Sequence, residues 1–260
     1  MTTAAIREPA GLTLDGVRLG YRERTVLERL DLTVAPGEIL VVVGKSGCGK
    51  SSLLRALAGL RPPEAGAVRA DGELVTGPSA DRALVFQDDA LLPWRTARRN
   101  IELALRLRGV PRPERRELAL RRLDEVGLTG YADYLPRDLS GGMRQRVQLA
   151  RALAAAPRAL LMDEPFGALD TQTRAGMQRL LVDTWRAHPT TVVFVTHALA
   201  VPAVAEQFDL PAQRRDAADD GTRHTHPPFG FRLGHRGGVT EHRFVDDSCA
   251  HRILPRCRCL

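Results

Sequence analysis

Lysine and aromatic side chains are scarce in this 260-residue sequence. Only two of its 38 basic residues are lysines, and both, Lys45 and Lys50, lie within one six-residue stretch. The aromatic content of 5% is too low for the stacking platforms on which proteins bind single-stranded nucleic acid. The net charge of +7 is carried by arginines dispersed along the chain rather than clustered in one basic segment. We therefore expect no nucleic-acid partner.

Long apolar runs and paired cysteines are also missing. The longest apolar stretches, such as residues 39–43 and 192–195, are far shorter than the ~20 residues that a membrane-spanning helix needs. Residues 1–11 lack the apolar region of a secretory signal. Cys48 stands alone and the other three cysteines crowd into the last twelve residues, which is not a disulfide framework. We expect a soluble cytoplasmic protein that reaches any membrane through a partner.

The arrangement of apolar residues predicts an α/β fold. Four short, continuously apolar runs are typical of parallel strands that are buried on both faces: residues 39–43, 83–86, 159–162 and 191–195. Residues 12–19 and 26–34 predict antiparallel strands before them, with a turn at Pro36 and Gly37. Between the second and third core strands, residues 100–134 predict a long helical insertion.

The sharpest motif is a glycine-rich stretch that matches G-x-x-x-x-G-K-[ST] between an apolar strand and a helix pattern. Its glycines let backbone N–H groups surround phosphate oxygens, and the following helix adds the positive end of its dipole. Lys50 would reach the β- and γ-phosphates, and the Ser51 hydroxyl would hold Mg²⁺. The motif predicts a nucleotide site made by Gly44, Lys45, Ser46, Gly47, Cys48, Gly49, Lys50, Ser51 and Ser52. The alternative is a glycine-rich β–α turn with an incidental lysine.

A second motif is the pair of carboxylates, Asp163 and Glu164, that ends the apolar run at residues 159–162. Ligands of open α/β sheets bind at this edge, where the strands have their carboxyl ends. Asp163 can orient the water shell of Mg²⁺, and Glu164 can polarise an attacking water. Alone, such a pair is more often a strand running into a solvated loop. Beside a phosphate loop, the metal and base interpretation is favoured.

A third motif is a second helix start that is suited to an anion. Ser140 is a natural N-cap, and Gly141 and Gly142 follow it before a helix pattern that ends near Ala155. One nucleotide does not need two such sites in one chain. A head-to-tail dimer, in which Ser140 and Gly142 of one copy face Lys50 of the other, explains both sites. In isolation the stretch would be only a well-capped helix.

Together, the three motifs resemble the ATP-binding subunit of an ABC transporter, in the family's order and spacing, over residues 12–197. The resemblance implies a P-loop NTPase whose RecA-like parallel-sheet core carries an N-terminal antiparallel β layer and a helical subdomain at about residues 90–145. It also implies that ATP and Mg²⁺ are the cofactors and that the chain acts as an ATPase.

The resemblance assigns roles to further residues of this sequence. Gln87 is similar to the family's glutamine that senses Mg²⁺ and the attacking water. His197 stands where the family places a histidine against the γ-phosphate, and Tyr21 where an aromatic ring stacks on adenine. Residues 168–170 resemble the loop that contacts the second subunit of the dimer.

Finer detail resembles the nitrate, sulfonate and taurine importers of this family. The features are the sequences at residues 85–87, 91–94 and 165–170, and Met143 in place of the usual glutamine. This resemblance implies ATP hydrolysis coupled to import of a small anion. Its implied partners are a second copy of the chain, integral-membrane permease subunits and, indirectly, a periplasmic or extracellular substrate-binding protein. The chain would lie peripherally at the cytoplasmic face of the inner membrane.

The sequence departs from the family pattern after His197. Pro202 interrupts any helix there, and we expect no β run to follow. Residues 198–260 are therefore predicted to be an atypical tail, either disordered or the product of a frameshift. Two other functions stay open: a degenerate, inactive nucleotide-binding subunit, or a soluble ABC-type ATPase that acts outside transport. Soluble relatives usually carry a long coiled coil or two ATPase halves, for which 260 residues leave no room.

Overall fold

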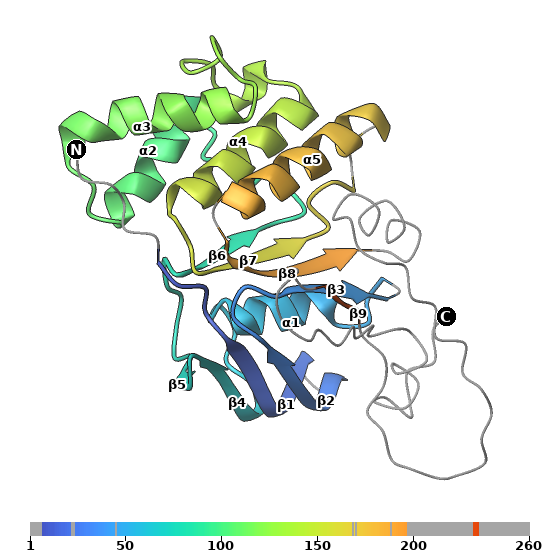
Figure 1. Cartoon of the computed structure of the whole chain (residues 1–260). Helices are drawn as coiled ribbons and strands as arrows, with labels where there is room; N and C mark the ends of the chain where they lie inside the picture. The colour runs from blue at the N-terminus through green and yellow to red at the C-terminus, as the bar shows by residue number, and fades with distance from the viewer. Residues whose placement is uncertain are drawn as a thin grey trace.

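The computed structural model describes residues 7–21, 24–44, 46–167, 169, 171–187, 189–196 and 231–233. Two sheets and a layer of helices make up this part of the chain (Figure 1). Within these ranges no helix combines the length and the apolar character that crossing a membrane requires. The α/β fold expected from the apolar runs is confirmed.

One sheet is antiparallel and is built mostly from the N-terminal strands. Its order is β2-β1-β4-β5. These strands are β1 (Leu12–Tyr21), β2 (Arg24–Val34), β4 (Ala65–Ala70) and β5 (Glu73–Leu74). The apolar side chains of β1 alternate, and Leu12, Leu14 and Leu19 are almost fully buried. Alternation buries one face of the sheet and leaves the other face to solvent. The antiparallel pairing of β1 and β2 is as the sequence predicted.

The second sheet has the order β6-β7-β8-β3-β9. Its strands are β3 (Ile39–Val43), β6 (Arg82–Val85), β7 (Ala159–Asp163), β8 (Thr191–Thr196) and β9 (Phe231–Leu233). The pairs between β6, β7, β8 and β3 are parallel, and every residue of β3, β7 and β8 is buried. Continuous burial explains why these runs lack alternation in the sequence.

Strand β9 corrects one expectation about the tail. We expected no β run after His197, yet Phe231–Leu233 pairs with β3 in antiparallel register, Ile39 opposite Leu233. Three residues are too few to show a period of two, so the sequence could not signal this strand. Edge pairing with β3 defines it instead. The rest of residues 198–260 lies outside the described part of the chain, and the prediction for it stays untested.

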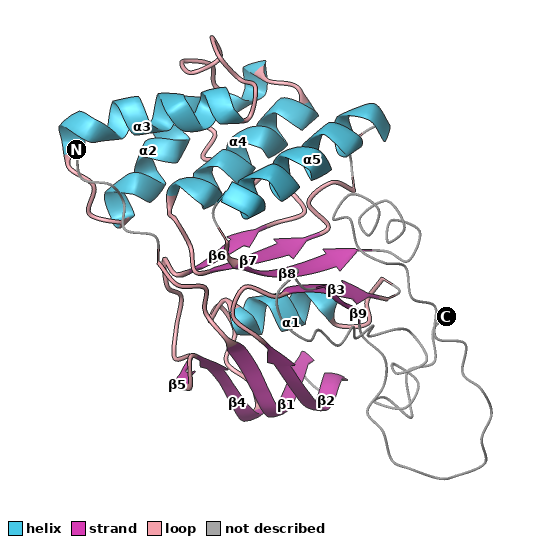
Figure 2. Ribbon diagram, viewed as in Figure 1, coloured by secondary structure: helices cyan, strands magenta, loops and turns pink. Residues whose placement is uncertain are grey.

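Helices cover both faces of the parallel sheet (Figure 2). Helix α1 (Lys50–Leu57) lies between the two sheets, where Leu54 and Leu57 pack with Leu40 and Val42 of β3. On the other face, α4 (Gly141–Ala154) and α5 (Thr171–Ala187) pack against the alternate residues of the same strands. The sheet therefore has a separate apolar core on each side.

The predicted helical insertion contains two helices. Helix α2 (Ala97–Leu107) and helix α3 (Arg112–Glu125) are separated by a turn in which Gly109 adopts a positive φ of 76°. Pro111 is the N-cap of α3, and Pro113 lies in its first turn, where the fixed φ of proline suits a helix start. Helix α2 begins earlier than residue 100, because the Thr96 side chain accepts a hydrogen bond from Arg99 N.

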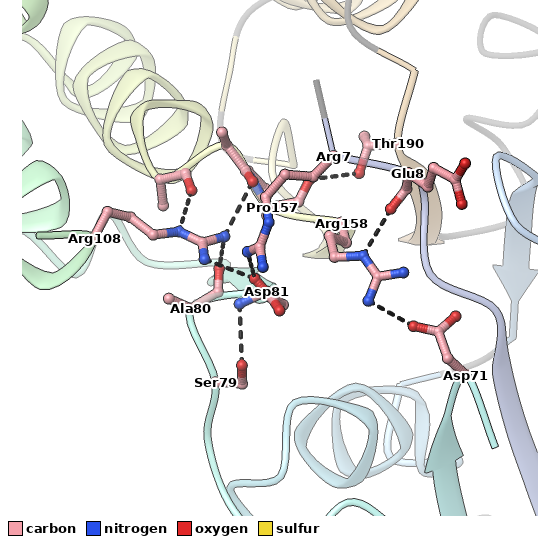
Figure 3. Close-up of polar contacts among 12 residues, drawn as sticks. Arg7, Glu8, Asp71, Ser79, Ala80, Asp81, Arg108, Pro157, Arg158 and Thr190 are labelled. Carbon is pink, nitrogen blue, oxygen red and sulfur yellow. Dashed lines mark hydrogen bonds and ion pairs between the residues drawn. The ribbon is translucent and has the colours of Figure 1, made fainter. Parts of the chain in front are cut away.

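An arginine and aspartate cluster ties the helical insertion to the sheets (Figure 3). Arg108, which follows α2, donates to Asp81 Oδ1 over 2.7 Å and also to the main-chain oxygens of Ala80, Ala155 and Ala156. Arg7 forms a second ion pair with Asp81. Partial burial raises the pKa of Asp81, but the hydrogen bond and charge of Arg108, with the charges of Arg7 and Arg158, hold the pKa below its ordinary value.

We expect Asp81→Asn to lower the free energy of unfolding by about 1–2 kcal/mol at pH 7. The carboxylate has a lowered pKa in the fold, so its stabilisation is full above the unfolded pKa of about 4 and is lost as the pH falls through the folded value. Urea unfolding at pH 7 and at pH 3 measures both effects. Asp138→Asn is the matched control, because its ion pair with Arg137 is exposed. An equal loss in both variants would contradict this account.

Candidate nucleotide site

The phosphate loop lies between β3 and α1, as the motif predicted. Lys50 is 7% exposed, and its Nζ donates to Gly44 O over 2.6 Å, so the lysine closes the loop on itself. Gly47 and Gly49 have positive φ angles of 80° and 104°. L-residues avoid this region, and the glycines therefore allow the chain to curl at the start of α1. Lys45, also predicted here, lies outside the described residues.

Gly49 is the more constrained of the two glycines. A Cβ at Gly49 would lie 2.8 Å from Val26 Cγ1 and 2.9 Å from Leu27 Cδ2, whereas a Cβ at Gly47 would meet nothing within 4 Å. We expect Gly49→Ala to cost about 2–3 kcal/mol of unfolding free energy and Gly47→Ala about 1 kcal/mol. The affinity for ATP, and the free energy of unfolding measured in urea, should both fall further in Gly49→Ala than in Gly47→Ala. Equal effects would show that φ alone, without packing, constrains the loop.

The two carboxylates at the end of β7 meet the loop. Ser51 Oγ donates to Asp163 Oδ1 over 3.0 Å, and Glu164 Oε1 lies 4.0 Å from Lys50 Nζ. Hydroxyl and carboxylate oxygens are ligands that Mg²⁺ prefers, so Ser51 and Asp163 fit the predicted metal role. The two carboxylates at the end of β7 therefore lie beside the phosphate loop, as the sequence predicted.

The backbone of Glu164 is held in an unusual conformation. Its φ is +44°, a region that residues other than glycine seldom adopt. Two hydrogen bonds fix it: Glu164 N donates to Val195 O of β8, and Gly167 N donates to Glu164 O, each over 3.0 Å. The turn directs the carboxylate to Lys50 with only 14% of the side chain exposed. Such strain is typical of functional positions.

The second helix start has the predicted cap. Ser140 is exposed and its Oγ accepts a hydrogen bond from Met143 N over 3.3 Å at the start of α4. A Cβ at Gly142 would approach Thr173 Cγ2 of α5 to 3.1 Å, so the glycine permits close packing of α4 and α5. Gly141 is also exposed and is the first residue of the helix.

Three side chains of α4, which the sequence analysis missed, hold the segment that carries Gln87. Gln148 donates to Phe86 O and Asp88 O, the carbonyls on either side of the exposed Gln87. Arg144 donates to Asp89 Oδ2 over 2.6 Å and Arg151 to Ala90 O over 2.9 Å. Residues 144, 148 and 151 are spaced by four and three positions, which puts them on one face of the helix. This spacing was the only sign in the sequence that the three side chains act together.

Tyr21 lies at the end of β1 with its ring against arginine. The Arg61 guanidinium is 3.5 Å from the ring centroid, and Arg55 donates to the Tyr21 hydroxyl over 3.2 Å. A hydrogen bond with Ser52, together with Arg55 and Arg61, lowers the pKa of Tyr21. The predicted stacking on adenine stays a prediction. His197, Ala168 and Asp170 lie outside the described residues, so their predicted roles also stay untested.

Comparison with known proteins decides the family. The model of the ABC transporter family matches residues 27–167, which include the phosphate loop, the start of α4 and the end of β7. The chain belongs to the ABC transporter family. It is the ATP-binding subunit of an importer and an ATPase with the P-loop fold.

Several ABC transporter subunits are similar to this chain over most of their length. The taurine import ATP-binding protein TauB of Chromobacterium violaceum is 51% identical over 190 residues, 72% of this chain and 73% of the relative. The nitrate import ATP-binding protein NrtD of Synechocystis is 47% identical over 185 residues, 71% of this chain and 70% of the relative. The resemblance to importers of this type is confirmed.

A solved ABC structure supports the fold. It is a dimeric, post-hydrolysis state of an ATP-binding cassette bound to ADP and Pi. It shares 34% sequence identity with this chain at a TM-score of 0.66, and the match covers 73% of this chain and 89% of the other. The P-loop NTPase fold predicted from the motifs is confirmed.

Proposed function

We propose that this subunit hydrolyses ATP with Mg²⁺ to drive import of a small anion such as nitrate, taurine or an aliphatic sulfonate. The observation that carries the proposal is the convergence of four side chains at one sheet edge. Lys50 and Ser51 come from the phosphate loop, and Asp163 and Glu164 from the end of β7, with contacts of 3.0 and 4.0 Å between them. The names of the taurine and nitrate relatives support the class of cargo.

Each of the four side chains has a distinct task. The Lys50 ammonium, which the hydrogen bond to Gly44 O holds in place, binds the negatively charged β- and γ-phosphates of ATP. Ser51 and Asp163 would hold Mg²⁺, which neutralises the charge of the phosphate oxygens. Glu164 accepts a proton from the attacking water, and its turn keeps the carboxylate next to Lys50. Gln87 and His197 would orient the same water and the γ-phosphate, and Tyr21 would contact the adenine.

The start of α4 serves a second copy of the chain. Ser140, Gly141 and Gly142 present a helix N-terminus, whose partial positive charge suits the phosphates bound by Lys50 of the partner. Two nucleotides would then lie between two head-to-tail subunits. The dimeric state of the similar ATP-binding cassette supports this arrangement. Closure on ATP and reopening after hydrolysis would drive the transport cycle.

Transport requires partners that cross the membrane. We expect integral-membrane permease subunits to bind this chain at the cytoplasmic face of the cell membrane. A periplasmic or extracellular substrate-binding protein would deliver the anion to the permease and meet this chain only indirectly.

Reconstitution tests the cargo directly. The chain and its permease subunits would be placed in proteoliposomes with ATP, and uptake of labelled taurine, ethanesulfonate and nitrate would be measured. We expect ATP-dependent uptake of one of these anions. ATP hydrolysis with no uptake of any of the three would contradict the proposed cargo, and failure of the chain to bind the permease would contradict transport itself.

A further inference from the structure

A second basic site lies in the helical insertion, apart from the nucleotide site. An open cavity of about 950 Å³ is formed by the turn before α2, by α2 itself and by the first turns of α3, which lie side by side in Figure 2. Seven of its eleven lining residues are arginines, and only Glu102 is acidic. No residue of the phosphate loop, of the end of β7 or of the start of α4 lines it. We call it the arginine basin.

Among the described residues, the carboxylates near the arginine basin form ion pairs with only one of its arginines, although the charge of Asp133 also acts on Arg99 and Arg116 at longer range. Arg98 pairs with both Glu102, at 2.5 Å, and Asp133, at 2.8 Å. Within the described ranges, the other six lining arginines form no ion pair. Several like charges around one cavity repel one another, and an anion between them would relieve that repulsion.

A fixed arginine and the start of a helix add to this positive charge. The Nε atoms of Arg95 and Arg98 are buried and, among the described residues, have no hydrogen-bond partner. Because these two atoms are closed to solvent, an anion in the basin would contact the terminal N–H groups of the lining arginines instead. Arg115 is held in place by a bond from its Nε to Val110 O over 2.6 Å. The N-terminus of α3, at Arg112, adds the positive end of a helix dipole.

We propose that the arginine basin binds the phosphate or sulfonate group of a small anion. Guanidinium groups bind these tetrahedral groups through paired N–H donors, and several arginines can share the three or four oxygens. The exposed ring of Trp94 and the side chains of Leu103 and Pro113 supply apolar contacts for the body of such an anion. The same group occurs in free anions and in phospholipid headgroups, and the test distinguishes these sources.

Trp94 provides a local reporter of binding. The sequence has two tryptophans, so Trp185→Phe leaves Trp94 as the only one. With the nucleotide site filled by MgADP, this protein is titrated with inorganic phosphate and with ethanesulfonate at constant ionic strength, and the fluorescence of Trp94 is recorded. Vesicles of phosphatidylglycerol, and of phosphatidylcholine as the neutral comparison, form a second arm. Equilibrium dialysis with labelled phosphate counts the bound anion independently of fluorescence.

The double variant Arg99→Gln, Arg116→Gln identifies the site. We expect saturable binding that weakens at least about tenfold in this variant. Arg121→Gln should bind normally, because Arg121 is an exposed arginine of α3 that does not line the basin. ADP affinity should stay unchanged in all variants, which shows that they fold.

Each outcome bears on the proposal. Binding of phosphate or ethanesulfonate that depends on Arg99 and Arg116 supports a free anion. Binding only to phosphatidylglycerol vesicles, with the same dependence, supports a lipid headgroup. The proposal is overturned if neither arm shows saturable binding, or if Arg121→Gln weakens binding as much as the double variant does.

Discussion

Glu164→Gln should lower the rate of ATP hydrolysis at least about a hundredfold and leave ATP affinity nearly unchanged. The amide keeps the size of the side chain and the strained turn at φ +44°, but it cannot accept a proton from water. The contacts of Lys50 and Ser51 with Gly44 and Asp163 do not involve Glu164. Steady-state hydrolysis and equilibrium binding of labelled ATP separate the two effects.

Glu125→Gln is the matched control for this substitution. Glu125 pairs with Arg122 at the end of α3, outside the nucleotide site, so hydrolysis should be unaffected. Turnover of the Glu164 variant close to that of the native chain would remove Glu164 from the role of base. A native chain that binds ATP without turnover would instead support the degenerate, inactive subunit considered from the sequence.

Ser140→Arg should lower the rate of ATP hydrolysis at least about a hundredfold, while the monomer still binds ATP. The substitution removes the cap on Met143 N and places a large side chain at the exposed start of α4. If this helix end acts on the nucleotide of a second copy, the substitution damages only the site that two copies form together. Binding at low protein concentration and hydrolysis at high concentration measure the two states.

Thr96→Arg controls for the lost cap. Thr96 caps α2 as Ser140 caps α4, through a hydrogen bond of 3.3 Å from the backbone N–H three residues further on. Loss of a cap costs about 1 kcal/mol of helix stability in either case. Similar hydrolysis in the two variants, or equal loss of binding and hydrolysis in the Ser140 variant, would show that the start of α4 is only structural.

The sequence predicted those parts of the molecule that depend on local chemistry. Buried parallel strands require continuous apolar runs, and β3, β7 and β8 lie within one residue of their expected bounds. A phosphate loop needs glycine where φ is positive, which Gly47 and Gly49 satisfy. Ser140 caps α4 through its own side chain, so its neighbours along the chain were sufficient to predict it.

Features that depend on contacts distant in the sequence could not be predicted. Strand β9 is defined by pairing with β3, almost two hundred residues earlier. Arg61 packs on Tyr21 only because the segment after α1 returns to β1. Gln148 reaches Phe86 O because α4 packs beside β6. The arginine basin likewise requires α2 and α3 to fold against each other, since its arginines are dispersed along the sequence.

Light scattering on the Glu164→Gln protein, with and without MgATP, tests most directly whether two copies share each nucleotide. Slow hydrolysis in this variant would preserve the ATP-bound state during the measurement. We predict a monomer without ATP, a dimer that holds one ATP per chain when ATP is present, and a monomer again when Ser140→Arg is added. ATP bound to a chain that stays monomeric, or a dimer unaffected by Ser140→Arg, would contradict the account.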